Sequence, residues 1–122
     1  MKPLDSKKLT KIAISALEDI KGKDITVLNV AHLTSLCEAM IIASGDSNRQ
    51  VRALADHVRE KIKEAGGDII GTEGEDGAEW ILVDAGDIVV HVMHPVTRQH
   101  YNLEELWGVT TRMRAHDPRT KP

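Results

Sequence analysis

The fold is decided by the stretch Glu79-Trp80-Ile81-Leu82-Val83-Asp84-Ala85-Gly86-Asp87-Ile88-Val89-Val90-His91-Val92-Met93. β-Branched and aromatic residues dominate on both sides of Ala85-Gly86, and this dipeptide suits a tight turn. The stretch therefore predicts a β-hairpin with strands at 80–84 and 87–93. A two-residue loop at Ala85-Gly86 would pair Trp80 with His91 and Leu82 with Val89.

The two faces of this hairpin differ, because successive side chains of a strand point to opposite faces. One face is uniformly apolar: Ile81, Val83, Ile88, Val90 and Val92. The other face is mixed: Trp80, Leu82, Asp84, Asp87, Val89, His91 and Met93. A large aromatic side chain among polar groups is typical of a protein-binding patch, but a helix of the same chain could equally cover this face. Both interpretations stay open.

Hydrophobic spacing predicts the remaining elements. Helices are expected at 5–21 and 47–65, and strands at 24–30, 39–45 and 68–73. A short last helix, capped by Asn102, is expected to contain Leu103, Leu106 and Trp107. This order predicts an α/β or α+β protein with helices around one sheet of about five strands. The segment 39–73 would form a right-handed crossover.

The composition is that of an ordinary globular protein. The chain has 122 residues, 41% of them hydrophobic, which predicts one domain with an aliphatic core. Its net charge of −3 gives no broad attraction to phosphate, so we expect no sequence-specific nucleic-acid binding. Cys37 is the only cysteine and is expected to be buried, which fits a reducing cytoplasm. No signal peptide is visible, and the longest apolar run is too short to span a membrane.

Two groups of residues invite a chemical interpretation. Gly45-Asp46-Ser47 lies between a strand and a helix, where free backbone amides can hold phosphate. Ser47 with Gln50 also matches a capping box, which explains the same residues more simply. Asp84 and Asp87 flank the hairpin turn and could hold metal ions for phosphoryl transfer, but aspartates are common beside turns for conformational reasons.

The histidines make a weaker case for a metal site. His91 and His94 would point to opposite faces of a strand, so they cannot ligate one ion together without a kink. His100 could approach them from beyond Pro95, but no cysteine joins the set. We therefore expect no metal site.

Five motifs in a fixed order relate the chain to a known family. They are Met40-Ile-Ile-Ala-Ser-Gly-Asp-Ser-Asn-Arg-Gln-Val51, Ala55-Asp56-His57-Val58, Glu73-Gly74, the hairpin Trp80–Met93, and Tyr101-Asn-Leu-Glu-Glu-Leu-Trp107. Together they resemble the ribosomal silencing factors, the Iojap family, over residues 5–108. The resemblance implies a mixed sheet flanked by helices, distantly similar to nucleotidyltransferases but without their catalytic carboxylates. Gly45 and Ser47 are similar to the nucleotidyltransferase Gly-Ser turn, but no Asp-x-Asp follows, and Glu38 stands where the family often has aspartate.

The resemblance also implies a function without chemistry. Such a protein represses translation, mainly under nutrient limitation, by binding the large ribosomal subunit through its ribosomal protein number fourteen. That protein lies on the intersubunit face, so its occupation blocks joining of the small subunit. The implied partner-binding residues are Trp80, Leu82, Val89, His91 and Tyr101. No catalytic residue, cofactor or membrane contact is implied.

Other interpretations of the same residues are retained. A magnesium-dependent, nucleotidyltransferase-like enzyme would use Asp84 and Asp87. The mixed face could instead form a symmetric homodimer of the free protein. Residues 1–108 are expected to form the silencing factor domain, and residues 109–122 are expected to be a polar, flexible tail.

Overall fold

The structure is a computed structural model that describes residues 4–106. Its elements, in chain order, are α1 (Ser6–Asp19), β1 (Lys23–Asn29), β2 (Ala39–Ser44), α2 (Asn48–Glu64), β3 (Gly71–Glu73), β4 (Trp80–Asp84), β5 (Ile88–Met93) and α3 (Pro95–Tyr101). This order confirms the predicted alternation of helices and strands. Trp107 and the tail at 109–122 lie outside the described residues.

The five strands form one mixed sheet in the order β1-β2-β5-β4-β3. β2 and β5 are parallel, and the other three neighbouring pairs are antiparallel. The predicted α+β fold with a five-stranded mixed sheet is therefore confirmed. β3 runs in the same direction as β2, but the hairpin β4–β5 lies between them, so the link through α2 leads to the far edge of the sheet.

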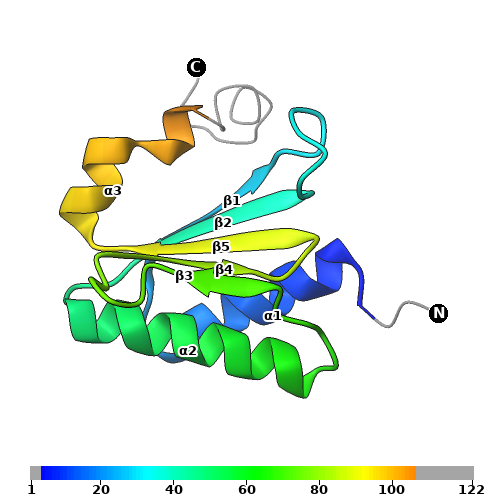
Figure 1. Cartoon of the computed structure of the whole chain (residues 1–122), viewed down its shortest axis with the longest axis horizontal. Helices are drawn as coiled ribbons and strands as arrows, with labels where there is room; N and C mark the ends of the chain where they lie inside the picture. Colours follow the sequence, from blue (N-terminus) through cyan, green and yellow to red (C-terminus); the bar gives the residue numbers. More distant parts are fainter. Residues whose placement is uncertain (1–3, 107–122) are drawn as a thin grey trace.

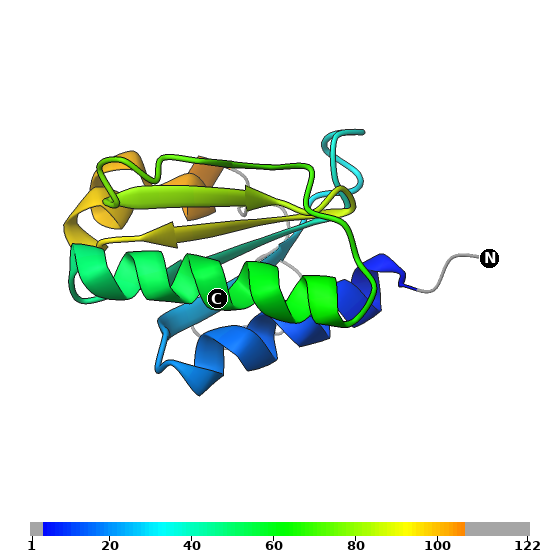
Figure 2. The ribbon, with the colours of Figure 1, turned by 60° about the horizontal axis from the view of Figure 1, so that its bottom comes forward.

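The helices lie on both sides of the sheet, but unequally. Figures 1 and 2 show α1 and α2 side by side against one face, with α3 on the other. The larger apolar cluster fills the space between α1, α2 and the sheet, and it contains the apolar hairpin face 81, 83, 88, 90 and 92. A smaller cluster on the opposite face contains Leu28, Val30, Cys37, Met40, Ile42 and Met93. β2 is thus covered on both faces, which explains its continuous apolar run.

The predicted register of the hairpin is wrong by two residues. Trp80 pairs with Met93 and Leu82 with His91. The amide of Ala85 donates to the carbonyl of Ile88 at 3.0 Å, so the loop consists of Gly86-Asp87. Gly86 has φ +89° and is the first residue of that loop, as a type II′ turn requires. A shift of two residues leaves every side chain on its predicted face.

The short last helix predicted after Asn102 is present as a helical turn, but the sequence did not reveal the separate helix α3 that precedes it. α3 begins at Pro95, with His94 as its N-cap, and ends at Tyr101; its C-cap, Asn102, adopts a left-handed conformation with φ 50°. A further helical turn follows at 103–106. The spacing of apolar residues could not reveal α3, because its one buried side chain is that of Arg98. The pair Pro95 at the first helical position and Asn102 beyond the last one was the available signal.

Candidate functional site

Trp80 is the centre of the face that carries α3. It opens β4 and is half-buried. Its indole Nε1–H donates a hydrogen bond to Nδ1 of His91 at 3.0 Å. Its ring also lies against Tyr101, with ring centroids 4.9 Å apart and planes inclined by 46°. Two contacts therefore fix the indole: a hydrogen bond to His91 and ring packing against Tyr101.

His91 is buried beneath this arrangement, with 5% of its surface exposed. In the sheet it lies between Ile42 of β2 and Leu82 of β4. Burial among these neighbours lowers the pKa of His91 from 6.5 to about 4, so the ring is neutral at physiological pH. Because Nδ1 accepts the hydrogen bond from Trp80, the ring proton is assigned to Nε2. Nε2 is buried and finds no partner in the described part of the chain.

The five residues expected to bind a partner lie at different depths on one face. Trp80 and Val89 pack against the smaller apolar cluster and remain partly exposed, as does Leu82. Tyr101 is 55% exposed, whereas His91 lies below the surface. Trp80, His91 and Tyr101 are in direct contact, although Trp80 and His91 are diagonal neighbours rather than the predicted cross-strand pair. α3 therefore covers part of this face and leaves part of it open.

Exposed apolar side chains lie near both ends of this face. Leu106 is 71% exposed beyond α3, and Leu36 is 84% exposed in the connection between β1 and β2. Figure 1 shows α3 and this connection rising on the same side of the sheet, from opposite ends. An apolar surface of this kind is typical of protein–protein contact.

Arg98 attaches α3 to the sheet, and sequence reasoning missed it. Its guanidinium donates to Ser44 Oγ at 2.9 Å, to Thr26 Oγ1 at 3.1 Å and to both carboxylate oxygens of Glu104, at 2.9 and 2.8 Å. The Arg98 side chain is 10% exposed, so these partners replace water around a buried charge. Since α3 ends at Tyr101, this attachment also sets the position of the ring that contacts Trp80.

The residues considered for chemistry have structural roles in this fold. Ser47 caps α2 by accepting from the amide of Gln50 at 3.1 Å, and the Gln50 side chain accepts in turn from the amide of Asp46 at 2.7 Å. Asp84 Oδ1 accepts from the amide of Gly86 at 2.9 Å, which fixes the hairpin turn. The enzyme interpretation therefore gains no geometric support from Asp84. Within residues 4–106, no three His, Cys, Asp or Glu side chains are grouped to hold a metal ion.

Cys37 is buried as predicted, with 8% of its surface exposed. Burial raises the pKa of its thiol, and the nearby Asp84 carboxylate contributes to the same effect. The thiol is thus protonated and poorly reactive. Among the described helices, none combines the length and the apolar composition that crossing a membrane requires.

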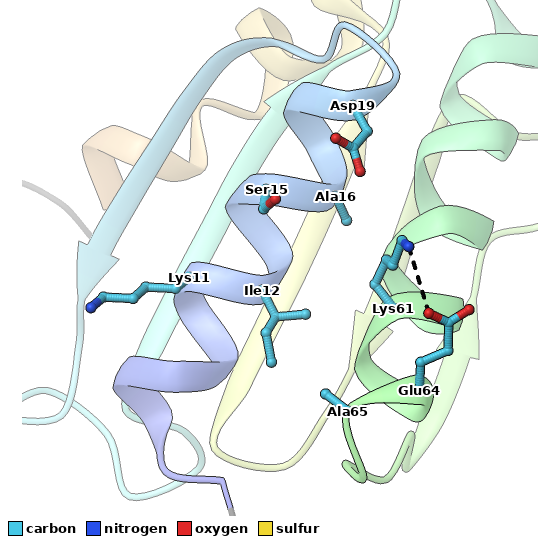
Figure 3. A pocket seen from close by; sticks show the side chains of 8 residues that line it. All are labelled: Lys11, Ile12, Ser15, Ala16, Asp19, Lys61, Glu64 and Ala65. Atoms are coloured by element: carbon cyan, nitrogen blue, oxygen red, sulfur yellow. Dashed lines mark ion pairs between the residues drawn. The ribbon is translucent and has the colours of Figure 1, made fainter.

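A groove of about 500 Å³ lies between α1 and α2, on the other side of the sheet from Trp80. Figure 3 shows Ile12, Ala16 and Ala65 along it, with charged side chains around them. Lys61 pairs with Glu64 at 3.5 Å, and Asp19 bonds to His57 at 3.1 Å. Charges of both signs line the groove, so they favour no particular class of ligand.

Comparisons with known proteins give one consistent family. The family described as "Ribosomal silencing factor during starvation" matches residues 3–122. Ribosomal silencing factor RsfS of Chromobacterium violaceum is 59% identical over 105 residues, which are 86% of this chain and 86% of that protein. The chloroplastic protein Iojap of Zea mays is 36% identical over 96 residues, which are 79% of this chain and 42% of that protein.

Structural comparison agrees with the sequence comparison. A crystal structure of a protein from Chromobacterium violaceum superimposes with a TM-score of 0.85 at 59% sequence identity, covering 86% of this chain and 88% of that one. The resemblance drawn from the five motifs is therefore confirmed. The chain belongs to the ribosomal silencing factor family.

Proposed function

We propose that this protein represses translation by binding the large ribosomal subunit and blocking the joining of the small subunit. Membership of the ribosomal silencing factor family supports a ribosome-associated role in regulating translation. The proposal adds three finer points, of which the first two are implied by the family resemblance and the third by the single cysteine of the sequence. The contact is made with large-subunit ribosomal protein number fourteen, the repression acts mainly under nutrient limitation, and the protein works in the cytoplasm.

The arrangement around Trp80 is the observation that carries the proposal. The indole is half-buried, bonded at its nitrogen to His91 and packed against the ring of Tyr101. Tryptophan and tyrosine are enriched among the few residues that supply most of the binding energy of an interface. A side chain already fixed in place loses little conformational entropy when a partner binds. Trp80 therefore has the properties of an interface anchor.

The chemistry of this face favours a protein partner over RNA. The exposed Tyr101 contacts Trp80, whereas the one arginine of α3 is buried and paired with Glu104. Binding to an RNA backbone draws mainly on exposed lysine and arginine. Glu75, Asp76 and Glu79 form an exposed acidic segment before β4, which would favour approach to a basic ribosomal protein.

The mechanism requires only that the bound protein occupies space. A domain seated on the intersubunit face of the large subunit excludes any part of the small subunit that must contact the same surface. No bond is formed or broken in this mechanism. The strength of repression then follows from the fraction of large subunits that are occupied, and so from affinity and concentration.

Sedimentation with isolated ribosomal subunits tests the proposal. The purified protein should travel with the large subunit and not with the small one in a sucrose gradient, and it should reduce the amount of joined ribosomes. Lys11→Ala is a matched control, because Lys11 is exposed on α1, on the other side of the sheet. The control should bind as the unmodified protein does. Absence of the protein from the large-subunit fractions would refute the proposal.

A further inference from the structure

We propose that His91 is a positioning residue, which holds the indole of Trp80 in its binding orientation without itself touching the partner. This inference rests on the proposed function, because it assumes that Trp80 anchors the contact with the large subunit. It assigns His91 a role different from that of the more exposed side chains on the same face. Those side chains meet the partner directly, whereas His91 acts through Trp80.

Geometry links the buried His91 to the exposed part of the face through its hydrogen bond with Trp80. His91 is 5% exposed and is paired with Ile42 of β2 and Leu82 of β4, so a partner cannot reach its ring while the face keeps this arrangement. The hydrogen bond from Trp80 Nε1–H to His91 Nδ1, at 3.0 Å, joins this buried ring to the half-buried indole. The direction of the indole N–H is thereby fixed before any partner arrives.

A buried imidazole is energetically unfavourable at this position. A buried donor without a partner loses its hydrogen bonds to water and gains none in return. Nε2 of His91 is such a group within the described part of the chain. An aliphatic side chain of similar size between Ile42 and Leu82 would avoid this loss. The property that an aliphatic side chain lacks is the acceptor Nδ1, which Trp80 uses.

Tyr101 completes the positioning from another direction. Its ring contacts Trp80 at a centroid distance of 4.9 Å, and the Arg98 contacts with Ser44 and Thr26 hold its helix on the sheet. Ring packing alone restricts where the indole lies but leaves the direction of its N–H free to vary. The hydrogen bond to His91 removes that freedom, so the two contacts have separate effects.

Three variants separate positioning from simple packing. His91→Leu removes the acceptor and keeps an apolar side chain. His91→Asn keeps an acceptor, because its carbonyl oxygen lies one bond beyond Cγ, as Nδ1 does in histidine. Trp80→Phe keeps a ring and removes the donor. If His91 acts through Trp80, His91→Leu should weaken large-subunit binding, His91→Asn should restore part of it, and His91→Leu should have no further effect once Trp80 is Phe.

The expected loss of affinity in His91→Leu is about fivefold, the value of one net hydrogen bond. A second readout uses the free protein: the Trp80 indole N–H signal in a ¹⁵N-correlated NMR spectrum, assigned through Trp80→Phe. His91→Leu should shift this signal. Circular dichroism should show that each variant is folded.

The outcomes distinguish this inference from the proposed function. A shifted indole signal together with weaker binding, partly restored by His91→Asn, supports the positioning role. If the unmodified protein binds the large subunit and folded His91→Leu binds equally well, the inference is wrong and the proposed function stands. If His91→Leu still weakens binding in the Trp80→Phe background, His91 does not act through Trp80. If the unmodified protein binds neither subunit, the proposed function fails and this inference fails with it.

Discussion

Mild acid should destabilise this protein in part through one buried residue, His91. Its pKa is about 4 in the folded chain, against 6.5 for an ordinary histidine, because the ring is buried. Well above pH 6.5 the ring is neutral in both the folded and the unfolded chain, so its titration leaves the free energy of unfolding unaffected. As the pH falls from 6.5 towards 4, His91 becomes protonated in the unfolded chain but stays neutral in the folded chain. The free energy of unfolding therefore decreases.

The size of this loss follows from the gap between the two pKa values. Each unit of difference corresponds to about 1.4 kcal/mol, so the gap between 6.5 and about 4 gives up to roughly 3 kcal/mol at pH 4. This is a substantial part of the stability of a domain of this size. Most of the effect should appear between pH 6 and pH 4.5, where the unfolded chain is largely protonated at this site.

Urea unfolding of the unmodified protein and of His91→Leu between pH 7 and pH 4 measures the effect. Acidic side chains also change the stability over this range, but they do so in both proteins, so the difference between the two isolates His91. His91→Leu should become progressively more stable relative to the unmodified protein as the pH falls. Equal pH dependence in both would show that His91 is not a buried neutral histidine.

Three further predictions concern other parts of the same face. Arg98→Met should lower the free energy of unfolding, measured in urea, by about 3 kcal/mol, because the buried Ser44 hydroxyl and the Glu104 carboxylate lose their hydrogen bonds to Arg98. The near-ultraviolet circular dichroism of Trp80 should also change. Unchanged stability would contradict the attachment of α3 by Arg98. Replacing the acidic residues at 75, 76 and 79 by lysine should slow association with the large subunit at low salt and have less effect at high salt; an unchanged rate at low salt would remove the steering role. If the free protein forms a dimer through the Trp80 face, analytical ultracentrifugation should show that Trp80→Glu is monomeric; a dimer that persists in this variant uses another surface.

Much of the fold could be predicted because its signals are local. The alternation at 80–93 assigned each hairpin side chain to a face, and the apolar run at 39–43 marked the strand that the structure shows as β2. Ser47 with Gln50 marked the start of α2 correctly. Each of these patterns depends on residues close in the chain, where spacing determines which side chains meet.

The order of strands and the hairpin register were harder to predict. Either Ala85-Gly86 or Gly86-Asp87 can form a two-residue loop, and both choices put the same side chains on each face. The choice depends on the positive φ of Gly86 at the first loop position. Nothing local in the sequence indicates that β5 pairs with β2, which places the hairpin between β2 and β3.

The sequence placed the candidate residues of the hairpin on one face but did not reveal how deeply each is buried. Face alternation put His91 on the same face as Trp80, but its burial depends on Trp80 itself and on the neighbouring strands. α3 itself is attached through Arg98, whose partners Thr26 and Ser44 are 72 and 54 residues away in the sequence. A helix held by a buried arginine has no apolar stripe to reveal it.

The central claim is that Trp80 anchors this protein on the large ribosomal subunit. The most direct test is sucrose-gradient sedimentation of isolated large subunits with the unmodified protein, with Trp80→Ala and with the control Lys11→Ala, after circular dichroism has shown that all three are folded. The unmodified protein and Lys11→Ala should travel with the large subunit, and Trp80→Ala should stay at the top of the gradient. Folded Trp80→Ala that still travels with the large subunit would contradict the claim.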